Sequence, residues 1–207
     1  MVLPLIRHAG AGRHPGVVNT ELNFEDQLMT TTTGIVDFTI KPATKKDVPV
    51  ILRFIQKLAD YERLSHEVVA TEELLQRTLF GQRRTAEVAL GYFHSEPVGF
   101  VLFFHNFSTF VGRSGIYIED LFVDEPFRRR GFGGALLTHV AKLAAARECG
   151  RLEWSVLDWN EPAINFYKKL GATPMNEWTM FRITGNNLQQ LAGREKNLST
   201  SSSPAYS

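Results

Sequence analysis

The sequence predicts a mixed α/β domain, and three changes in its hydrophobic pattern lead to that fold class. Apolar residues recur at helical spacing from Val48 to Ala59. The period becomes two from Ala86 to Tyr92, as in a half-buried strand. An apolar strand from Ile116 to Val123 then leads through a basic, glycine-containing loop straight into an amphipathic helix. The complete pattern predicts the element order β-α-α-β-β-β-α-β-α-β, without internal repeats.

In the first half of the chain, each predicted element has its own start or stop signal. Thr44, followed three residues later by Asp47, is a capping pattern for the first helix. Thr71 caps a shorter second helix, which Gly81 ends. His94 opens a turn that joins two antiparallel strands as a hairpin. The predicted elements are a strand at Ile35–Lys41, helices at Val48–Glu62 and Glu72–Leu79, and strands at Thr85–Tyr92 and Val98–Phe107, whose aromatic residues Phe100, Phe103, Phe104 and Phe107 are expected in the sheet core rather than in an aromatic ligand site.

In the second half, the central strand Ile116–Val123 is followed by a turn and by a helix that Gly150 ends. Asn160 is a good N-cap for the last helix, and Pro162 suits its first turn, where no backbone N–H is missed. Gly171 closes that helix. The residues expected to face inward are Leu136, Leu137, Val140, Leu143 and Ala144 on the first of these helices and Ala163, Phe166, Tyr167 and Leu170 on the last; further strands are predicted at Leu152–Leu157 and Trp178–Thr184.

The two ends of the chain do not read as core, so the predicted domain spans residues 35–192. Residues 1–34 begin apolar, but Pro4, Arg7 and His8 interrupt the run too early for a secretory signal. We expect a disordered extension there, with a weak organelle-targeting signal as the alternative and Met29 as another possible start. The tail, residues 193–207, is rich in serine and is predicted to be flexible.

Composition argues against several functional classes. The formal net charge is +1, which does not fit a nucleic-acid-binding protein. A single cysteine, Cys149, fits a reducing compartment, so we expect a cytoplasmic protein. No apolar run approaches the roughly 18 residues that a membrane span needs. The six histidines show no metal-ligand spacing, and no nucleophile elbow of the form G-x-S-x-G occurs.

The loop between the central strand and its helix is the first candidate site. It contains Arg128, Gly131 and Gly133 in the spacing R-x-x-G-x-G. Glycines allow the backbone to approach an anion, and the helix that follows directs unpaired N–H groups and its positive dipole end at the same point. Phosphate binds at such points, although the same residues also fit an ordinary basic turn. The loop lacks the Lys-Ser/Thr of a P-loop.

This loop and five other stretches resemble the GNAT N-acetyltransferase superfamily, and within it the diamine (spermidine/spermine) and thialysine N-acetyltransferase branch. The stretches are KPATKKDV, LADYERL, IYIEDLFV, RRRGFGG, VLDWNEPAINFYKKLGA and EWTMFRI. The resemblance implies a mixed, mostly antiparallel sheet flanked by helices. It also implies acetyl-CoA as acetyl donor, a small-molecule amine as acceptor, no metal, and a homodimer without nucleic-acid or membrane partners.

The resemblance further implies which residues bind the cofactor. The strand backbone would pair with the pantetheine arm, the basic loop would hold the pyrophosphate, and the start of the last helix would add a hydrogen bond to the cofactor. For Asn160, capping of its own helix explains the residue equally well. The residues are Leu121, Phe122, Val123, Arg128, Arg129, Arg130, Gly131, Phe132, Gly133, Gly134, Asn160, Pro162 and Ala163.

Three side chains are candidates for the chemistry. Glu119 and Asp120 interrupt an apolar strand, and since neighbours on a strand face opposite ways, only one of the two can face a given cleft. The resemblance selects Glu119 as the base or base-positioning residue; otherwise both acids would pair with cations at the strand edge. It selects Tyr167 as the acid that protonates the departing thiolate, whereas periodicity alone makes Tyr167 a core aromatic.

The acceptor substrate is the least determined feature. Tyr61, Glu62, Glu119 and residues 153–155 (Glu153, Trp154 and Ser155) match substrate-contacting positions of the branch, and acids at 62, 119 and 153 suit a cationic amine. The segment before Trp178 is shorter than in the diamine enzymes, so polyamines, lysine-like amino acids and other small amines all stay open. The alternatives are a protein or peptide N-acetyltransferase and a non-catalytic acyl-CoA-binding module.

Overall fold

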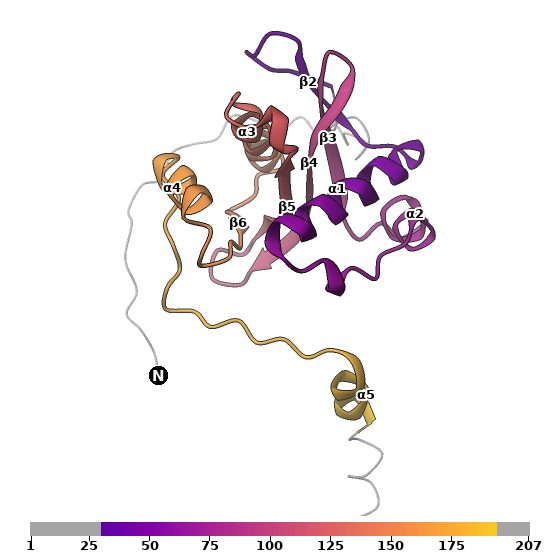
Figure 1. Cartoon of the computed structure of the whole chain (residues 1–207). Helices are drawn as coiled ribbons and strands as arrows, with labels where there is room; N and C mark the ends of the chain where they lie inside the picture. Colours follow the sequence, from indigo (N-terminus) through magenta and orange to yellow (C-terminus); the bar gives the residue numbers. More distant parts are fainter. Residues whose placement is uncertain (1–29, 194–207) are drawn as a thin grey trace, which may run out of the picture. The chain divides into compact units, whose positions relative to one another are not determined.

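The structure, a computed structural model, describes residues 30–193 (Figure 1). The chain divides into two compact units, one ending at Ser155 and one beginning at Val156. The first unit contains β1 (Thr31–Thr32), β2 (Phe38–Pro42), α1 (Val48–Glu62), α2 (Glu72–Phe80), β3 (Glu87–Phe93), β4 (Glu96–Ser108), β5 (Arg113–Val123), α3 (Phe132–Ala146) and β6 (Leu152–Trp154). The second contains α4 (Glu161–Lys169) and α5 (Gly185–Gly193).

The first unit is built on one six-stranded sheet in the order β1-β2-β3-β4-β5-β6. Neighbouring strands are antiparallel, except that β5 and β6 run parallel. The turn at His94 and Ser95 joins β3 to β4 as the predicted hairpin, and both residues have positive φ, as a tight hairpin turn requires. The predicted fold class, a mixed and mostly antiparallel sheet flanked by helices, is confirmed.

Helices cover both faces of this sheet, with α1 and α2 on one face and α3 on the other (Figure 1). Phe54 of α1 packs on Phe100 and Phe122, with ring centroids 5.7 Å and 5.9 Å apart. On the other face, Phe132 of α3 stacks on Phe38 at 4.1 Å. The residues that were predicted to face inward from α3 are all buried: Leu136, Leu137, Val140, Leu143 and Ala144. Burial of these apolar faces stabilises the fold.

An irregularity in the pairing of β4 with β5 decides which way the central acids face. Leu102 and Phe103 are consecutive in β4, but they pair with Asp120 and Ile118, which are two residues apart in β5. Glu119 is therefore one extra residue in β5. Directly opposite residues of an antiparallel pair lie on the same face. Because Leu102 belongs to the core cluster under α1, Asp120 lies on the α1 face and Ile118 on the α3 face. Such β-bulges are frequent beside active sites.

Two further contacts anchor α3. Its C-cap residue Arg147 forms a bidentate ion pair with Glu87 of β3, with N···O distances of 2.6 Å and 2.8 Å, and both side chains are almost completely buried. At the other side, Thr31 Oγ1 lies 2.9 Å from His139 Nδ1. The helix is therefore fixed to β3 and to β1.

Several predicted elements are wrong or differ in length. Thr31 and Thr32 form a strand, although disorder was expected up to residue 34, because their backbone pairs with β2. Residues 178–184 form no strand, since a strand requires a partner and the described structure pairs this segment with none; α5 follows it unpredicted. The strand predicted to reach Leu157 ends at Trp154. Phe107 is 60% exposed rather than core, because it lies near the tip of the β4–β5 hairpin.

The predictions for residues 1–29 and 194–207 lie outside the described residues. Among the helices of residues 30–193, none has the length and apolar character needed to cross a bilayer.

Candidate active site

The basic loop before α3 has the backbone geometry of an anion-binding site. Arg129 and Gly131 both adopt positive φ, 62° and 84°, on either side of Arg130. The helix begins at Phe132, and its first intrahelical bond runs from the N–H of Ala135 to the carbonyl of Gly131 at 3.0 Å. The N–H groups of residues 132–134 therefore have no acceptor within the helix. Such a concave set of N–H groups at the positive end of a helix dipole fits a diphosphate.

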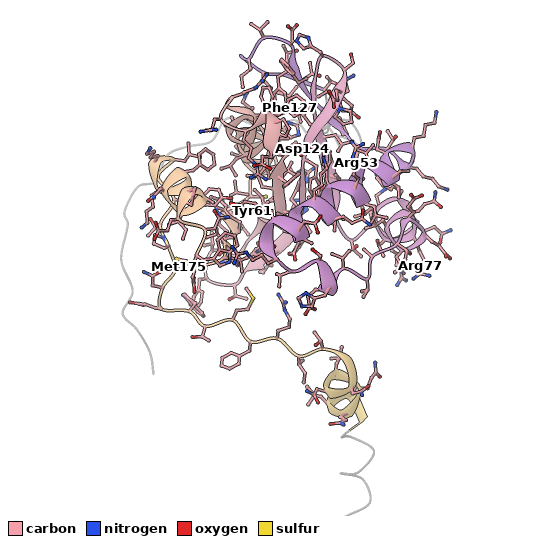
Figure 2. All side chains as sticks on the ribbon, viewed as in Figure 1. Arg53, Tyr61, Arg77, Asp124, Phe127 and Met175 are labelled. Atoms are coloured by element: carbon pink, nitrogen blue, oxygen red, sulfur yellow. The ribbon has the colours of Figure 1, made fainter. Side chains whose placement is uncertain are left out.

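The three arginines of the loop have different surroundings. Arg128 donates from Nε to the carbonyl of Val123 at 2.9 Å, and its guanidinium lies 4.6 Å from the ring centre of Tyr61 and 5.5 Å from that of Phe122. Arg130 lies over two other rings, those of Phe93 and Phe127, at 5.5 Å and 5.7 Å. Arg129 is exposed. Arg128 therefore contacts the end of α1, where substrate contacts were predicted; Figure 2 labels Tyr61 there.

Asp120, on the α1 face of the sheet, belongs to a cluster of three acids with Glu62 and Glu119, whose charges act on it. Asp120 is half-buried, and the removal of its carboxyl from water, together with the negative charges of Glu119 and Glu62, raises its pKa from 3.8 to about 7. Burial also raises the pKa of Glu62, at the last position of α1. Glu119 is exposed. The charges of Glu62 and Glu119, two of the predicted substrate residues, therefore both act on Asp120.

The edge of β5 that faces β6 is open beyond Ile118. The parallel pairing of these strands covers Ile116 to Ile118 only, opposite Leu152–Trp154. On its other side, β5 stays paired with β4 up to Val123. The segment Leu121–Val123 thus has one edge on which the described sheet places no strand, between the acid cluster and the basic loop. An extended ligand can add to such an edge through main-chain hydrogen bonds.

The predicted substrate residues of β6 are engaged by neighbours within the first unit. Glu153 accepts a hydrogen bond from Asn106 Nδ2 at 2.7 Å and forms an ion pair with Arg151 at 2.8 Å. Ser155 and Tyr117 share a hydrogen bond of 2.6 Å between their hydroxyls. Trp154 is half-buried and lies opposite Ile118. The charge of Glu153 is therefore already balanced by Arg151.

The remaining predicted residues belong to the second unit. Asn160 is the N-cap of α4, and its side-chain oxygen accepts from the N–H of Ala163 at 3.4 Å, as the capping prediction requires. Pro162 occupies the first turn. Tyr167 contacts Phe166 with ring centroids 5.3 Å apart, and burial raises the pKa of its hydroxyl.

Sequence reasoning considered Asp120 but did not select it. The available signal was the pair of adjacent acids inside an apolar strand. Strict alternation then allowed only one of them to face the cleft, and this argument fails where a bulge adds a residue. Across residues 30–193, the structure contains no group of three or more His, Cys, Asp or Glu side chains placed to hold a metal ion.

Comparison with known proteins bears directly on this arrangement. The sequence model of the acetyltransferase (GNAT) family matches residues 54–172, which include the end of α1, the acid cluster, the basic loop and α4. The chain belongs to the GNAT family. It is therefore an acetyltransferase.

The chain is similar to two N-acetyltransferases and to a protein of solved structure. The L-ornithine N5-acetyltransferase of Arabidopsis thaliana is 38% identical over 197 residues, covering 73% of this chain and 86% of that protein. The thialysine N-epsilon-acetyltransferase of Mus musculus is 36% identical over 166 residues, covering 75% of this chain and 97% of that protein. An integron cassette protein of V. cholerae is similar in structure, with a TM-score of 0.65, 27% identity, and coverage of 76% of this chain and 98% of that one.

Proposed function

We propose that this GNAT protein transfers the acetyl group of acetyl-CoA to the primary amine of a small cationic substrate, by direct attack in a ternary complex. The observation that carries the proposal is the arrangement along β5. An acid cluster, an open strand edge and an anion-binding loop follow one another from Glu119 to Gly131. This order suits an amine, an acyl-pantetheine arm and a diphosphate.

The cofactor would be held by main-chain groups more than by side chains. The N–H groups of residues 132–134 and the positive-φ turn at Gly131 support a role in binding the pyrophosphate. The open edge of Leu121–Val123 supports pairing with the pantetheine arm. Asn160, Pro162 and Ala163 keep the cofactor role that the family resemblance gives them. When bound, acetyl-CoA supplies an acyl group activated as a thioester.

The acid cluster would recruit and deprotonate the acceptor. An alkyl amine has a pKa of about 10.4, so roughly one molecule in a thousand carries a free lone pair at neutral pH. Carboxylates attract the ammonium ion and can take its proton. We propose that Glu62 and Glu119 meet the amine, with Glu119 as the base or the residue that positions it. Tyr61 and residues 153–155 would line the same side.

Tyr167 is the proposed general acid. A donor to a departing thiolate must hold its proton at the working pH. The raised pKa of Tyr167 means that its hydroxyl stays protonated to a higher pH than an ordinary tyrosine. Its role otherwise comes from the family resemblance of the NFY motif.

We propose a lysine-like amino acid with a side-chain amine as the acceptor, with polyamines as the second class. The two relatives described above are named for L-ornithine and thialysine, and each is at least 36% identical to this chain. We further propose that the protein is a cytoplasmic homodimer that acts without nucleic acid or membrane. The net charge of +1 and the single cysteine support the cellular part of this proposal, and the dimer rests on the family resemblance.

A screen of acceptors tests the proposal. The full-length protein and acetyl-CoA are incubated with L-ornithine, thialysine, spermidine and lysine-containing peptides, and free thiol is measured. We expect release with the amino acids and a product acetylated on the distal amine by mass spectrometry. Turnover of peptides alone would establish the protein-directed alternative, and no turnover with any amine would refute the proposal. Light scattering of the same sample measures the oligomeric state.

A further inference from the structure

Asp120 and Glu119 are neighbours in sequence, yet the bulge gives them different surroundings. Asp120 pairs with Leu102, a residue of the apolar cluster that α1 and α2 cover. Its carboxyl is half-buried, whereas the Glu119 side chain is exposed. If β5 had continued without the extra residue, Asp120 would have shared the face of Ile118 and pointed to α3. The bulge therefore places Asp120 on the face that carries the end of α1.

The groups around Asp120 determine how it ionises. α1 contributes the charge of Glu62, and β5 contributes that of Glu119. The guanidinium of Arg128, from the basic loop, lies over the rings of Tyr61 and of Phe122, two residues from Asp120 on β5, and its Nε donates to the main-chain carbonyl of Val123. On the β4 side, the opposite residue is apolar. Burial and the negative charges of Glu119 and Glu62 together raise the pKa of Asp120 to about 7.

We propose that Asp120, placed on the α1 face by the bulge, accepts the proton of the acceptor amine, and that Glu119 and Glu62 position the ammonium ion. This assignment rests on the acetyltransferase function proposed above. In this assignment the half-buried Asp120 is the base, and Glu119 and Glu62 attract the ammonium ion.

The step balances as a proton transfer followed by acyl transfer. The ammonium nitrogen gives one proton to the Asp120 carboxylate, and its freed lone pair forms the C–N bond with the acyl carbon. The C–S bond breaks with its electron pair on sulfur, and the thiolate takes a proton from an acid such as Tyr167. The nitrogen loses its second proton as the amide forms, and that proton restores the acid, so the net reaction releases the one proton held by Asp120. A carboxylate whose conjugate acid has a pKa of about 7 instead of 3.8 is about a thousandfold stronger as a base. It still releases its proton to water near neutral pH, so the next turnover can begin.

The test compares three isosteric or conservative variants with the wild type over pH 5–10, using the best amine from the screen. In the wild type, kcat/KM is expected to level off above an apparent pKa near 7. In Asp120→Asn, kcat/KM should fall by roughly 10²- to 10⁴-fold at pH 7.5. Its break near pH 7 should vanish, and the rate should climb with unit slope toward the pKa of the free amine. Asp120→Glu should restore a break.

Glu119→Gln is the matched control, because it removes a neighbouring charge without removing the proposed base. Its kcat/KM should fall, but the break should persist and move to lower pH, since the charge of Glu119 raises the pKa of Asp120. A purely structural role for Asp120 would not predict these opposite effects on the profile. A break that survives in Asp120→Asn, or one that disappears in Glu119→Gln instead, overturns the assignment.

A second measurement does not depend on turnover. In the full-length protein labelled with ¹³C at aspartate carboxyl carbons, the signal missing from Asp120→Asn should titrate near pH 7. Titration near 4 overturns the inference, whatever the kinetics show. If the wild type acetylates amines but Asp120→Asn keeps the wild-type profile, this inference alone fails. If the wild type acetylates no amine in the screen, the proposed function itself fails.

Discussion

Replacing Gly131 by alanine is expected to weaken binding of acetyl-CoA by about tenfold to a hundredfold. Gly131 has φ +84°, a conformation that costs an L-residue about 1–2 kcal/mol. A Cβ there would also lie 3.2 Å from Ile35 Cδ1, so Ile35 must move by a few tenths of an ångström. If the turn relaxes instead, one N–H of the loop loses a hydrogen bond to a charged group, which is worth about 1.5–3 kcal/mol. Each 1.4 kcal/mol corresponds to about a tenfold change in dissociation constant.

Gly112→Ala provides the matched control. Gly112 also has positive φ, +67°, but no atom lies within 4 Å of its added Cβ, and it is in the β4–β5 hairpin. Both variants should lose a similar 1–2 kcal/mol in urea unfolding, whereas isothermal titration with CoA should detect weaker binding only for Gly131→Ala. Unchanged CoA affinity in Gly131→Ala, together with the same loss of stability, would refute the role of this turn as the pyrophosphate site.

Three other changes have defined outcomes. Arg147→Met leaves Glu87 buried without its cation and should cost about 3–5 kcal/mol in urea unfolding, while adding Glu87→Leu should recover most of it; a loss below 1 kcal/mol would contradict a buried pair. Tyr167→Phe should lower kcat by roughly 10²-fold or more with CoA affinity unchanged, and full turnover would exclude Tyr167 as the acid. Asn160→Ala removes the cap to Ala163 and should destabilise α4 by about 1 kcal/mol, read as faster amide hydrogen exchange in that helix; unchanged exchange would show that the cap contributes little.

Helix caps, which are local sequence signals, correctly predicted where three helices begin. The caps at Thr44, Thr71 and Asn160 gave the starts of three helices to within a few residues, because capping is a contact within four residues. The segment 178–184 is rich in aromatic and β-branched residues, as strands are, but strand formation depends on a distant partner that the local pattern does not specify. The short strand at Thr31–Thr32 is the opposite case. Its sequence resembles a linker, but its backbone pairs with β2 and so forms a strand.

The sequence located the loop of the candidate site but could not predict the geometry around it. The R-x-x-G-x-G spacing located the loop, and the structure shows positive φ at Gly131 as that spacing suggests. Periodicity could not reveal that β5 contains one extra residue, because a bulge is a property of two strands together. For the same reason the sequence could not show that Asn106 of β4 donates a hydrogen bond to Glu153 of β6.

Two contacts join the segment that follows β5 to α1, and they connect the proposed positions of the amine and of the cofactor diphosphate. Lys57 of α1 forms an ion pair with Asp124, and Arg128 lies over the ring of Tyr61, the residue before Glu62. Figure 2 labels Asp124 and Tyr61. The wall proposed to face the amine is thus joined to the loop proposed to bind the diphosphate. A shift of that loop on cofactor binding would reach the amine side through these contacts, and thermodynamic linkage then requires each ligand to change the affinity for the other by the same factor.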